Sequence, residues 1–224
     1  MHSRKVTRHV IWGARGHARV IRDWFVTQGS DCMLAIDNDA SVAPPWPGCK
    51  LAIGMQGLEQ LLREERMGFG SLGVVVAIGG SRGSDRIKIE DELSSRGAAI
   101  LEVRHPTANV CSSAVFGSGC QLLMGSIVGS AVRLGRSVII NSGAQVDHDC
   151  VVEDGVHVGP GAVVAGETKI GRNVFIGAGA VVLPRVTLGQ NVVVGAGAVV
   201  TSDVAGGLVV TGSPAREVRH VAGR

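Results

Sequence analysis

The chain has 224 residues and a formal net charge of +3; its Lys and Arg are scattered and form no basic stripe with interleaved aromatics, so nucleic-acid binding is not expected. No apolar run reaches the roughly 18 residues that cross a membrane, and the first residues do not resemble a signal peptide. The five cysteines contain no C-x-x-C pair, which favours reduced thiols in a cytoplasmic protein. With 33 Gly and no Tyr, the composition indicates a narrow, regular core of aliphatic side chains.

The first hundred residues alternate between short apolar runs and amphipathic stretches. Strands are expected at 10–12, 33–36, 73–78 and 99–103, and helices at 18–28, 58–66 and 85–96. This alternation predicts a small parallel α/β sheet, an N-terminal Rossmann-like half domain over residues 1–104.

Two Gly-rich turns follow strands of this half. The first, Gly-Ala-Arg-Gly-His, ends at His17, and the second begins at Gly79. A turn of this kind between strand and helix offers backbone N–H groups to a phosphate, and Asp37, at the end of the second expected strand, is placed to meet a ribose hydroxyl. One loose glycine turn also fits ordinary tight-turn chemistry. The pair predicts a crevice that is too small for a dinucleotide cofactor and suits a nucleotide diphosphate.

A repeat of six residues fills the second half, from Ala108 to Asp203, without one insertion. Fifteen of the sixteen third-place residues are aliphatic, the first place is nearly always small, and Gly is the commonest residue at the fourth place. A period of six fits neither a helix nor a single strand. It predicts a β-helix over 105–224, in which the first and third places point inward, Gly permits the tight corner, and residues 18 apart stack at about 4.8 Å. Cys120 and Cys150 fall in the small inward slot and are interpreted as packing residues.

His148 stands at the outward-facing fifth place of its six, between two carboxylates, Asp147 and Asp149. A histidine beside an acid is suited to proton abstraction at neutral pH, so His148 is a candidate general base. His157 is also expected to point outward. The ordinary alternative for either residue is a solvated surface histidine, which is how His9 and His220 are interpreted.

These motifs together resemble one family. A half domain carrying G-A-R-G-H-A-R-V-I, followed by an uninterrupted repeat carrying V-D-H-D-C-V-V-E-D-G-V-H-V-G-P-G, resembles the hexapeptide-repeat sugar acetyltransferases of the sialic acid O-acetyltransferase, bacillosamine and perosamine N-acetyltransferase group. Parallel crossovers are normally right-handed, but the resemblance implies a left-handed β-helix. It also implies an acetyl-CoA-dependent N-acetyltransferase without a metal. The acceptor would be the 4-amino group of a nucleotide-linked 4-amino-4,6-dideoxyhexose (a UDP-, GDP- or dTDP-sugar) used in surface polysaccharide (lipopolysaccharide) biosynthesis.

The resemblance also assigns residues. His148 is the base, Asp149 the acid that raises its basicity, and His157 a contact to acetyl-CoA. The expected nucleotide-sugar contacts are Arg15, Gly16, His17, Asp37, Asn38 and Gly79. Arg15 and Asn38 depart from the family's usual residues, which leaves the base and the sugar open.

The six-residue period also predicts an oligomeric state and two further features of the site. His148 and His157 are nine residues apart, so they should lie near different corners, very roughly 20 Å apart, and a homotrimer with sites between subunits is predicted to bring them together. Gly166 is one coil beyond His148 and is a candidate oxyanion donor. Ala178 and Ala196 form a ladder of small residues that suits the pantetheine arm of acetyl-CoA, unless they are small only because corners are tight.

Three alternatives remain. A sialic acid O-acetyltransferase, or another sugar O-acyltransferase, would use the same fold. A non-catalytic nucleotide-sugar-binding protein would lack the histidine-acid pair. A metal-dependent hydratase of the carbonic-anhydrase type would need three convergent histidines, and the repeat carries only two.

Overall fold

The computed structural model describes residues 6–32 and 34–221 and contains two compact units. The first comprises Met1–Ile78 and Lys88–Val103, and the second comprises Gly79–Ile87 and Arg104–Arg224. A short piece of the expected α/β half is therefore part of the second unit. No helix in the described part of the chain is long and apolar enough to span a membrane.

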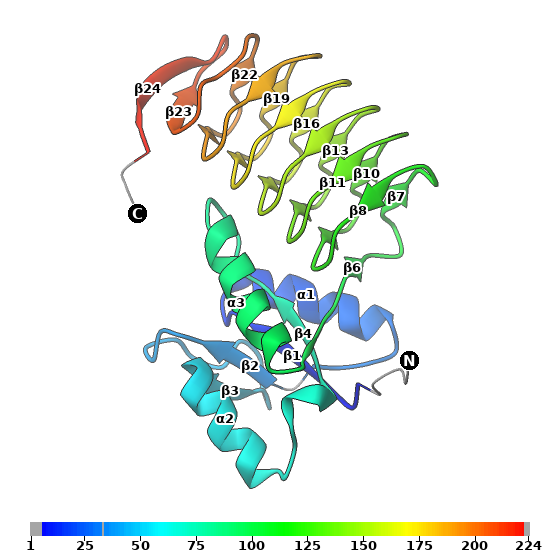
Figure 1. The fold of residues 1–224 in the computed structure, drawn as a ribbon, viewed down its shortest axis with the longest axis vertical. Coiled ribbons are helices and arrows are strands. Elements are labelled where there is room, and N and C mark those ends of the chain that lie inside the picture. Colours follow the sequence, from blue (N-terminus) through cyan, green and yellow to red (C-terminus); the bar gives the residue numbers. More distant parts are fainter. Residues whose placement is uncertain (1–5, 33, 222–224) are drawn as a thin grey trace. The chain divides into compact units, whose positions relative to one another are not determined.

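Five parallel strands form the sheet of the first unit, in the order β3-β2-β1-β4-β5 (Figure 1). The elements are β1 Arg8–Trp12, α1 Gly16–Thr27, β2 Leu34–Asp37, β3 Lys50–Ile53, α2 Gly54–Glu64, the 3-10 turn η1 Phe69–Ser71, β4 Leu72–Val76, α3 Gly83–Ser95 and β5 Ala99–Ile100. The expected α/β sheet is confirmed. The sequence reading missed β3, which runs directly into α2, and Met33, the expected start of the second strand, lies outside the described residues.

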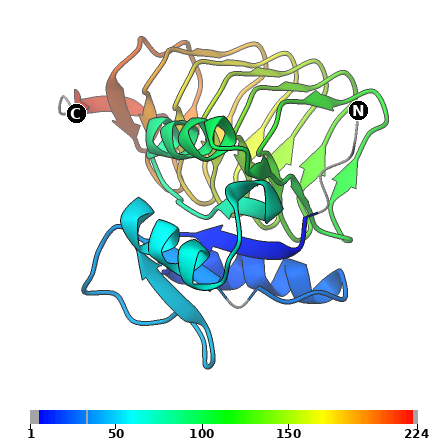
Figure 2. The ribbon, with the colours of Figure 1, turned by 60° about the horizontal axis from the view of Figure 1, so that its bottom comes forward.

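Both faces of this sheet are covered by helices. Val10 and Trp12 of β1 belong to one buried cluster with Leu58 and Leu62 of α2. Ile11, between them, points to the opposite face, because side chains alternate along a strand. Figures 1 and 2 show α1 on that opposite side. Every strand is parallel, so the turns after β1 and β2 meet at one edge of the sheet, as a ligand site at that edge requires.

The second unit is a parallel β-helix in which each six-residue unit contributes one short strand (Figure 1). Its strands are β6 Val103–Arg104, β7 Asn109–Val110, β8 Val115–Phe116, β9 Gln121–Leu122, β10 Ile127–Val128, β11 Arg133–Leu134, β12 Ile139–Ile140, β13 Gln145–Val146, β14 Val151–Val152, β15 His157–Val158, β16 Val163–Val164, β17 Lys169–Ile170, β18 Phe175–Ile176, β19 Val181–Val182, β20 Thr187–Leu188, β21 Val193–Val194, β22 Val199–Val200, β23 Leu208–Thr211 and β24 Arg216–His220. Each strand pairs with the strand three further along the chain, as β10 does with β13. Ile127 therefore lies beside Gln145, and the predicted stacking of residues 18 apart is confirmed.

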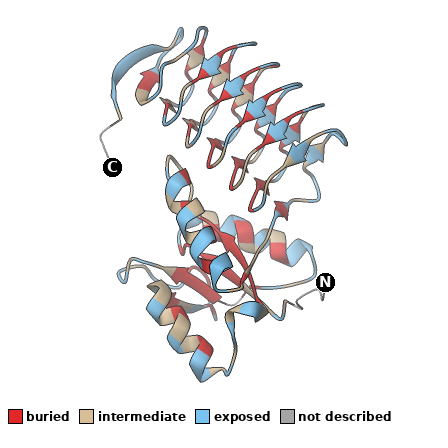
Figure 3. Ribbon diagram, in the orientation of Figure 1, coloured by how far each residue is buried: buried red, intermediate tan, exposed pale blue. Residues whose placement is uncertain are grey.

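Inward-facing residues fill the prism as the repeat predicts. The first and third places of each six form one continuous buried cluster, drawn as the buried inner segments of Figure 3. Cys120 and Cys150 are fully buried, and their thiols donate to the carbonyl oxygens of Gly135 and Ala165. Burial raises the pKa of the Cys150 thiol. The interpretation of both cysteines as packing residues is confirmed, and all five cysteines are unpaired thiols.

The explanation expected for the fourth-place glycines is wrong. The left-handed backbone that turns the corners is at the sixth places from Gly119 to Gly197, as in Gly119 with a φ of 72° and Asp149 with a φ of 58°. The fourth-place Gly129 has no positive φ. A Cβ there would lie 2.8 Å from the backbone nitrogen of His148 in the next coil. Glycine is therefore needed at fourth places such as Gly129, where successive coils approach closely.

Candidate active site

His148 lies on an open corner of the β-helix, between β13 and β14. Its side chain is 52% exposed, and its Nδ1 atom is 2.9 Å from Oδ2 of Asp149. The left-handed φ of Asp149, 58°, turns the carboxylate back toward the ring. The His148 backbone N–H donates to Oδ1 of Asp147 over 2.7 Å. Because Nδ1 bonds a carboxylate, the neutral ring carries its proton there and presents the lone pair of Nε2 outward.

Gly166 lies against this ring, one coil further along. A Cβ on Gly166 would be 2.6 Å from Nε2 and 2.7 Å from Cε1 of His148. Glu167, the next residue, donates its backbone N–H to the His148 carbonyl over 2.9 Å, which fixes the register of the two coils. The residue that repeat arithmetic placed beside the histidine therefore lies there, and only a glycine leaves room for the imidazole.

The charges around His148 favour its protonated form. The hydrogen bond that Asp149 accepts raises the pKa of His148, and the negative charges of Asp147, Asp149 and Glu167 add to this effect, while partial desolvation opposes it. A base with a raised pKa holds the abstracted proton more strongly. The corner can therefore accept a proton from a substrate near neutral pH and return it to a leaving group.

His157 differs from the sequence expectation. Its side chain points out of the prism on β15, as expected, but it is only 5% exposed because another segment of the chain covers it. Gly80 donates its backbone N–H to Nδ1 over 2.8 Å, and Gly79 packs on the ring edge, where its Cβ would be 3.5 Å from Cε1. Spacing within the repeat could not show that residues 79–87 cross this face. Gly79 was expected to contact the nucleotide-sugar, but in the structure it contacts His157, the residue expected to contact acetyl-CoA.

Two residues around His157 were missed by sequence reasoning. The side-chain amide of Asn141 lies 2.9 Å from Nε2 of His157. Arg86, on the first turns of α3, is fully buried and donates to carbonyl oxygens of the β-helix. Asn141 occupies the fourth position of its six-residue unit, where Gly is the commonest residue, and this departure from the repeat could have indicated a functional residue. Nothing in the local sequence distinguishes Arg86.

Ala178 and Ala196 lie at the fifth places that follow β18 and β21, on the corner after the sheet that carries His157. Both are exposed. Gly177 and Gly195 precede them, and a Cβ on Gly177 would be 2.5 Å from the backbone nitrogen of Ala196. The corner is therefore a ladder of small residues with closely stacked backbones, as the repeat arithmetic describes.

Most of the residues expected to hold the nucleotide are at the carboxyl edge of the α/β sheet. Asp37 accepts the Ala14 N–H at Oδ2 over 2.9 Å and the Asp39 N–H at Oδ1 over 3.0 Å. The carboxylate thus ties the end of β2 to the Gly-rich turn, a structural role that the sequence did not show. Each oxygen keeps a second lone pair, so contact with a ribose hydroxyl stays a prediction. Asn38, next along the chain, is exposed.

A cavity of about 390 Å³ opens beside this turn, lined by Ala14, Arg15, Gly16, Arg19, Ser41, Val42, Ala43 and Pro44. Arg15 precedes α1 and forms an ion pair of 2.6 Å with Asp39, with side chains 70% and 44% exposed. No side chain caps the first turn of α1, and that turn carries no acidic residue. His17 lies in the same turn. A helix N-terminus flanked by two arginines is suited to an anion.

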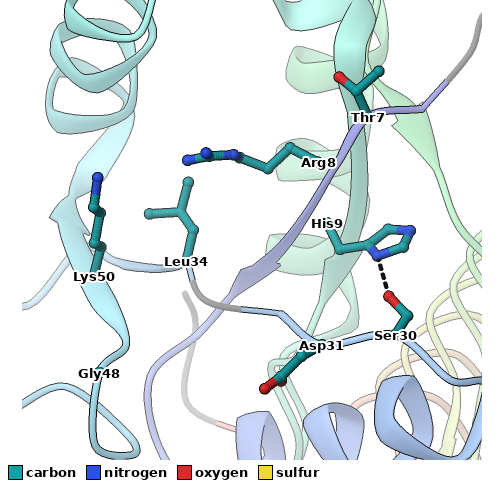
Figure 4. A pocket seen from close by; sticks show the side chains of 8 residues that line it. All are labelled: Thr7, Arg8, His9, Ser30, Asp31, Leu34, Gly48 and Lys50. Carbon is teal, nitrogen blue, oxygen red and sulfur yellow. Dashed lines mark hydrogen bonds between the residues drawn. The ribbon is translucent and has the colours of Figure 1, made fainter.

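A second cavity, of about 410 Å³, is at the opposite edge of the sheet (Figure 4). Arg8, Leu34 and Lys50, which begin β1, β2 and β3, contribute to its lining. His9 in its wall is half-buried, stacks on Phe25 with ring centroids 4.6 Å apart, and contacts the Ser30 hydroxyl over 2.8 Å. The expectation of His9 as a surface residue is therefore wrong. This cavity lies away from the Gly-rich turn, and its cations Arg8 and Lys50 both pair with Glu65.

Within residues 6–32 and 34–221, no group of three or more His, Cys, Asp or Glu side chains is placed to hold a metal ion. Residues 131–166 and 167–202 match the family model described as bacterial transferase hexapeptide (six repeats). The fold, the repeat and the histidine-acid corner define a hexapeptide-repeat acyltransferase with an α/β unit before a left-handed β-helix.

Solved structures place the chain more closely. Perosamine N-acetyltransferase from Caulobacter crescentus, solved with CoA and GDP-perosamine as a variant with one histidine replaced by asparagine, is 30% identical, has a TM-score of 0.84, and matches 96% of this chain and 98% of its own. The PglB acetyltransferase domain from Neisseria gonorrhoeae FA1090, solved with acetyl coenzyme A, is 29% identical with a TM-score of 0.81, over 94% and 98%. WeeI from Acinetobacter baumannii AYE is 26% identical with a TM-score of 0.79, over 94% and 99%. The chain belongs to the sugar N-acetyltransferase family that contains perosamine N-acetyltransferase, which confirms the resemblance drawn from the sequence.

Proposed function

We propose that this protein transfers the acetyl group of acetyl-CoA to the 4-amino group of a nucleotide-linked 4-amino-4,6-dideoxyhexose, with His148 as the general base. The observation that carries the proposal is the open corner on which Asp149 holds Nδ1 of His148 while Nε2 faces outward above Gly166. The similar perosamine enzyme was solved with CoA and GDP-perosamine. An N-acetyltransferase is therefore favoured over the O-acetyl alternative.

The chemistry follows from that corner. The amine nitrogen attacks the thioester carbonyl carbon and forms the new C–N bond, while Nε2 of His148 accepts the proton that the nitrogen loses. The carbonyl oxygen becomes an oxyanion. When the C–S bond breaks, the CoA thiolate leaves and takes the proton from the His148 imidazolium. Asp149 stabilises the positive charge on the ring between these two steps.

The oxyanion needs a donor near Nε2, and Gly166 supplies the candidate. No acceptor takes the Gly166 N–H among the described residues, and the glycine lies directly against the imidazole. A backbone N–H held in place by the coil costs no reorganisation as charge develops. The small-residue corner of Ala178 and Ala196 is proposed to hold the pantetheine arm, and His157 is proposed to contact acetyl-CoA.

The nucleotide is proposed to bind to the α/β unit. The uncapped N-terminus of α1, with Gly16 and His17 in its first turn, is suited to the diphosphate, and Arg15 and Arg19 add positive charge to the adjoining cavity. Calorimetric titration with UDP, GDP and dTDP identifies the base. Arg19→Ala should weaken the binding of every diphosphate about tenfold, since a phosphate contact does not discriminate between bases. Unchanged affinity would remove Arg19 from the site.

The assembly is proposed to be a homotrimer with three active sites between subunits. Four of the six outward-facing residues along one sheet of the β-helix are apolar, namely Ile127, Val163, Val181 and Val199, and Ile127 is 41% exposed; Asn109 and Gln145 are polar. Such a row favours burial against a second copy. Light scattering coupled to gel filtration measures the mass. A fully active monomer at micromolar concentration would rule out a site shared by subunits.

We also propose the cytoplasm as the compartment and surface polysaccharide (lipopolysaccharide) synthesis as the pathway. The free state of all five cysteines supports a reducing compartment. The proposed activity is tested directly by incubating the protein with acetyl-CoA and UDP-, GDP- or dTDP-linked 4-amino sugars and measuring free thiol release together with the mass of the acetylated sugar. Thiol release with no acetylated product from any of the three would contradict the proposed acceptor.

A further inference from the structure

Arg86 is the largest fully buried side chain of the described chain, with an exposure of 0%. It lies in Gly79–Ile87, the short segment that forms one compact unit with the β-helix. A guanidinium is expensive to bury unless its donors are paired, so its partners indicate what the residue does.

Among the partners are backbone carbonyls at one corner of two successive coils. Nη2 of Arg86 donates to the oxygen of Gly155 over 2.8 Å and to that of Ser137 over 3.0 Å, and Nε donates to Ser137 over 3.3 Å. Ser137 and Gly155 are sixth-place residues 18 apart, with φ of 56° and 71°. In the described coils, no backbone N–H of the β-helix donates to a sixth-place carbonyl. Where the segment covers them, these carbonyls need a donor, and Arg86 provides it.

The same segment is fitted closely to the coil at a second point. A Cβ on Gly83 would be 2.1 Å from the carbonyl oxygen of Gly155, so no larger residue fits at the start of α3. Three residues earlier, Gly80 has a φ of 69° and donates its N–H to Nδ1 of His157. The contact with His157 therefore depends on a segment that Arg86 and Gly83 fasten to the β-helix.

That contact fixes the chemistry of the ring. A backbone N–H is only a donor, so Nδ1 of His157 must be unprotonated, and the neutral ring carries its proton on Nε2. Nε2 lies 2.9 Å from the side-chain nitrogen of Asn141, whose Oδ1 accepts the Ser142 N–H over 2.8 Å, so the proton on Nε2 is assigned from the Gly80 contact and not from Asn141. Without the Gly80 N–H, Nδ1 would be free to accept a proton from water.

We propose that Arg86 is a positioning residue: by fastening Gly79–Ile87 to the β-helix, it holds the Gly80 N–H on His157 and keeps that ring in the Nε2–H form. The structural part concerns only described contacts. Its kinetic consequence rests on the proposed function, in which His157 contacts acetyl-CoA. Loss of the clamp should then raise KM for acetyl-CoA while kcat changes little, because binding in the ground state is what weakens.

The experiment uses the full-length protein and the variants Arg86→Met and Arg86→Lys. Arg82→Met is the matched control, since Arg82 lies one turn earlier with a side chain 57% exposed and paired to Asp85. Long-range nitrogen NMR of the ring reports the His157 tautomer. In the wild type and in Arg82→Met, His157 should give the signature of a single Nε2–H tautomer. In Arg86→Met, the signature should become that of a tautomer mixture, with KM for acetyl-CoA raised roughly threefold or more.

An unchanged His157 signature in folded Arg86→Met overturns the proposal, and so does an equal change in Arg82→Met. If Arg86→Met fails to fold, Arg86→Lys decides, because it keeps the charge but loses the fork of donors. A wild-type signature in that variant overturns the proposal, and an intermediate one supports it. A changed signature with unchanged KM supports the positioning role and contradicts only the acetyl-CoA contact of His157.

Discussion

Two histidines nine residues apart in the same repeat occupy opposite environments. His148 stands on an open corner with its side chain 52% exposed and a carboxylate on Nδ1. His157 is 5% exposed, with a backbone N–H on Nδ1 and the Asn141 amide at Nε2. The partner of Nδ1 therefore selects opposite tautomers, with a lone pair on the outward-facing Nε2 of His148 and a proton on the covered Nε2 of His157.

This difference separates two kinds of chemistry on one scaffold. A ring with a lone pair at Nε2 and a carboxylate behind it can accept a proton, whereas a ring with a proton at Nε2 can only donate a hydrogen bond to an acceptor such as a carbonyl. The repeat places both residues, but the left-handed Asp149 and the covering turn at Gly80 decide what each can do.

Replacing His148 should have the largest effect on catalysis. His148→Asn removes the lone pair that accepts the substrate proton, so kcat should fall by about 10²–10⁴. The side chain is largely exposed, so the melting temperature and acetyl-CoA binding should stay near wild type. Steady-state kinetics measure the loss, and the exposed His220→Asn is the control. A kcat within about threefold of wild type would remove His148 as the base.

Gly166→Ala tests whether the open corner depends on the coil beneath it. The added methyl would lie 2.6 Å from Nε2, so the exposed ring must move aside. A misplacement of about 1 Å in a reacting group can cost about 10² in rate, and kcat should fall by about that amount with little loss of stability. Gly68→Ala, where a Cβ meets nothing within 4 Å, is the control. Full activity in Gly166→Ala would show that the imidazole need not occupy the position seen here.

Ala178→Trp tests the corner that follows the His157 sheet. Ala178 is exposed, so an indole can be accommodated without disturbing the core, yet it would fill the proposed pantetheine groove. KM for acetyl-CoA should rise about tenfold, which corresponds to about 1.4 kcal/mol, with little effect on nucleotide binding. Ser118→Trp, an exposed fifth-place residue on another corner, should leave KM unchanged. Equal effects of the two substitutions would argue against a groove at Ala178.

The β-helix was predictable because its determinants are local and repeated. The inward-facing positions can be identified within each six-residue unit. The pairing of residues 18 apart then follows from counting, as Ile127 with Gln145 shows. The position of Gly166 beside His148 follows from the same count. The reason given for the fourth-place glycines failed because a sequence shows where Gly recurs and not whether φ or contact with the next coil requires it.

The surroundings of His157 were not predictable, because they come from a segment about 70 residues earlier, as the Gly80 and Arg86 contacts show. No periodic signal links residues 79–87 to the repeat. The structural role of Asp37 was missed for a similar reason, because its contact with the Ala14 N–H depends on how the turn after β1 folds back. Interactions that are distant in sequence and occur once leave no pattern to read.

The smallest effect is expected from Asp149→Asn, and its sign is the informative part. The hydrogen bond that His148 donates to Asp149 is the main cause that raises the pKa of His148 above its ordinary value of 6.5. A base works only when neutral, so wild-type kcat/KM should fall as the pH drops through that raised pKa. Asparagine tolerates the left-handed backbone at this position and removes only the charge, so the pKa of His148 should fall. The acidic limb of the pH profile should therefore move to lower pH, while the plateau falls by less than in His148→Asn because a less basic ring is a weaker proton acceptor. Asp147→Asn should shift the limb less, since Asp147 acts on the ring only through its charge. If the acidic limb of the pH profile stays in place in Asp149→Asn, the pKa of His148 does not determine that limb. Such a result would contradict the assignment of His148 as the proton acceptor.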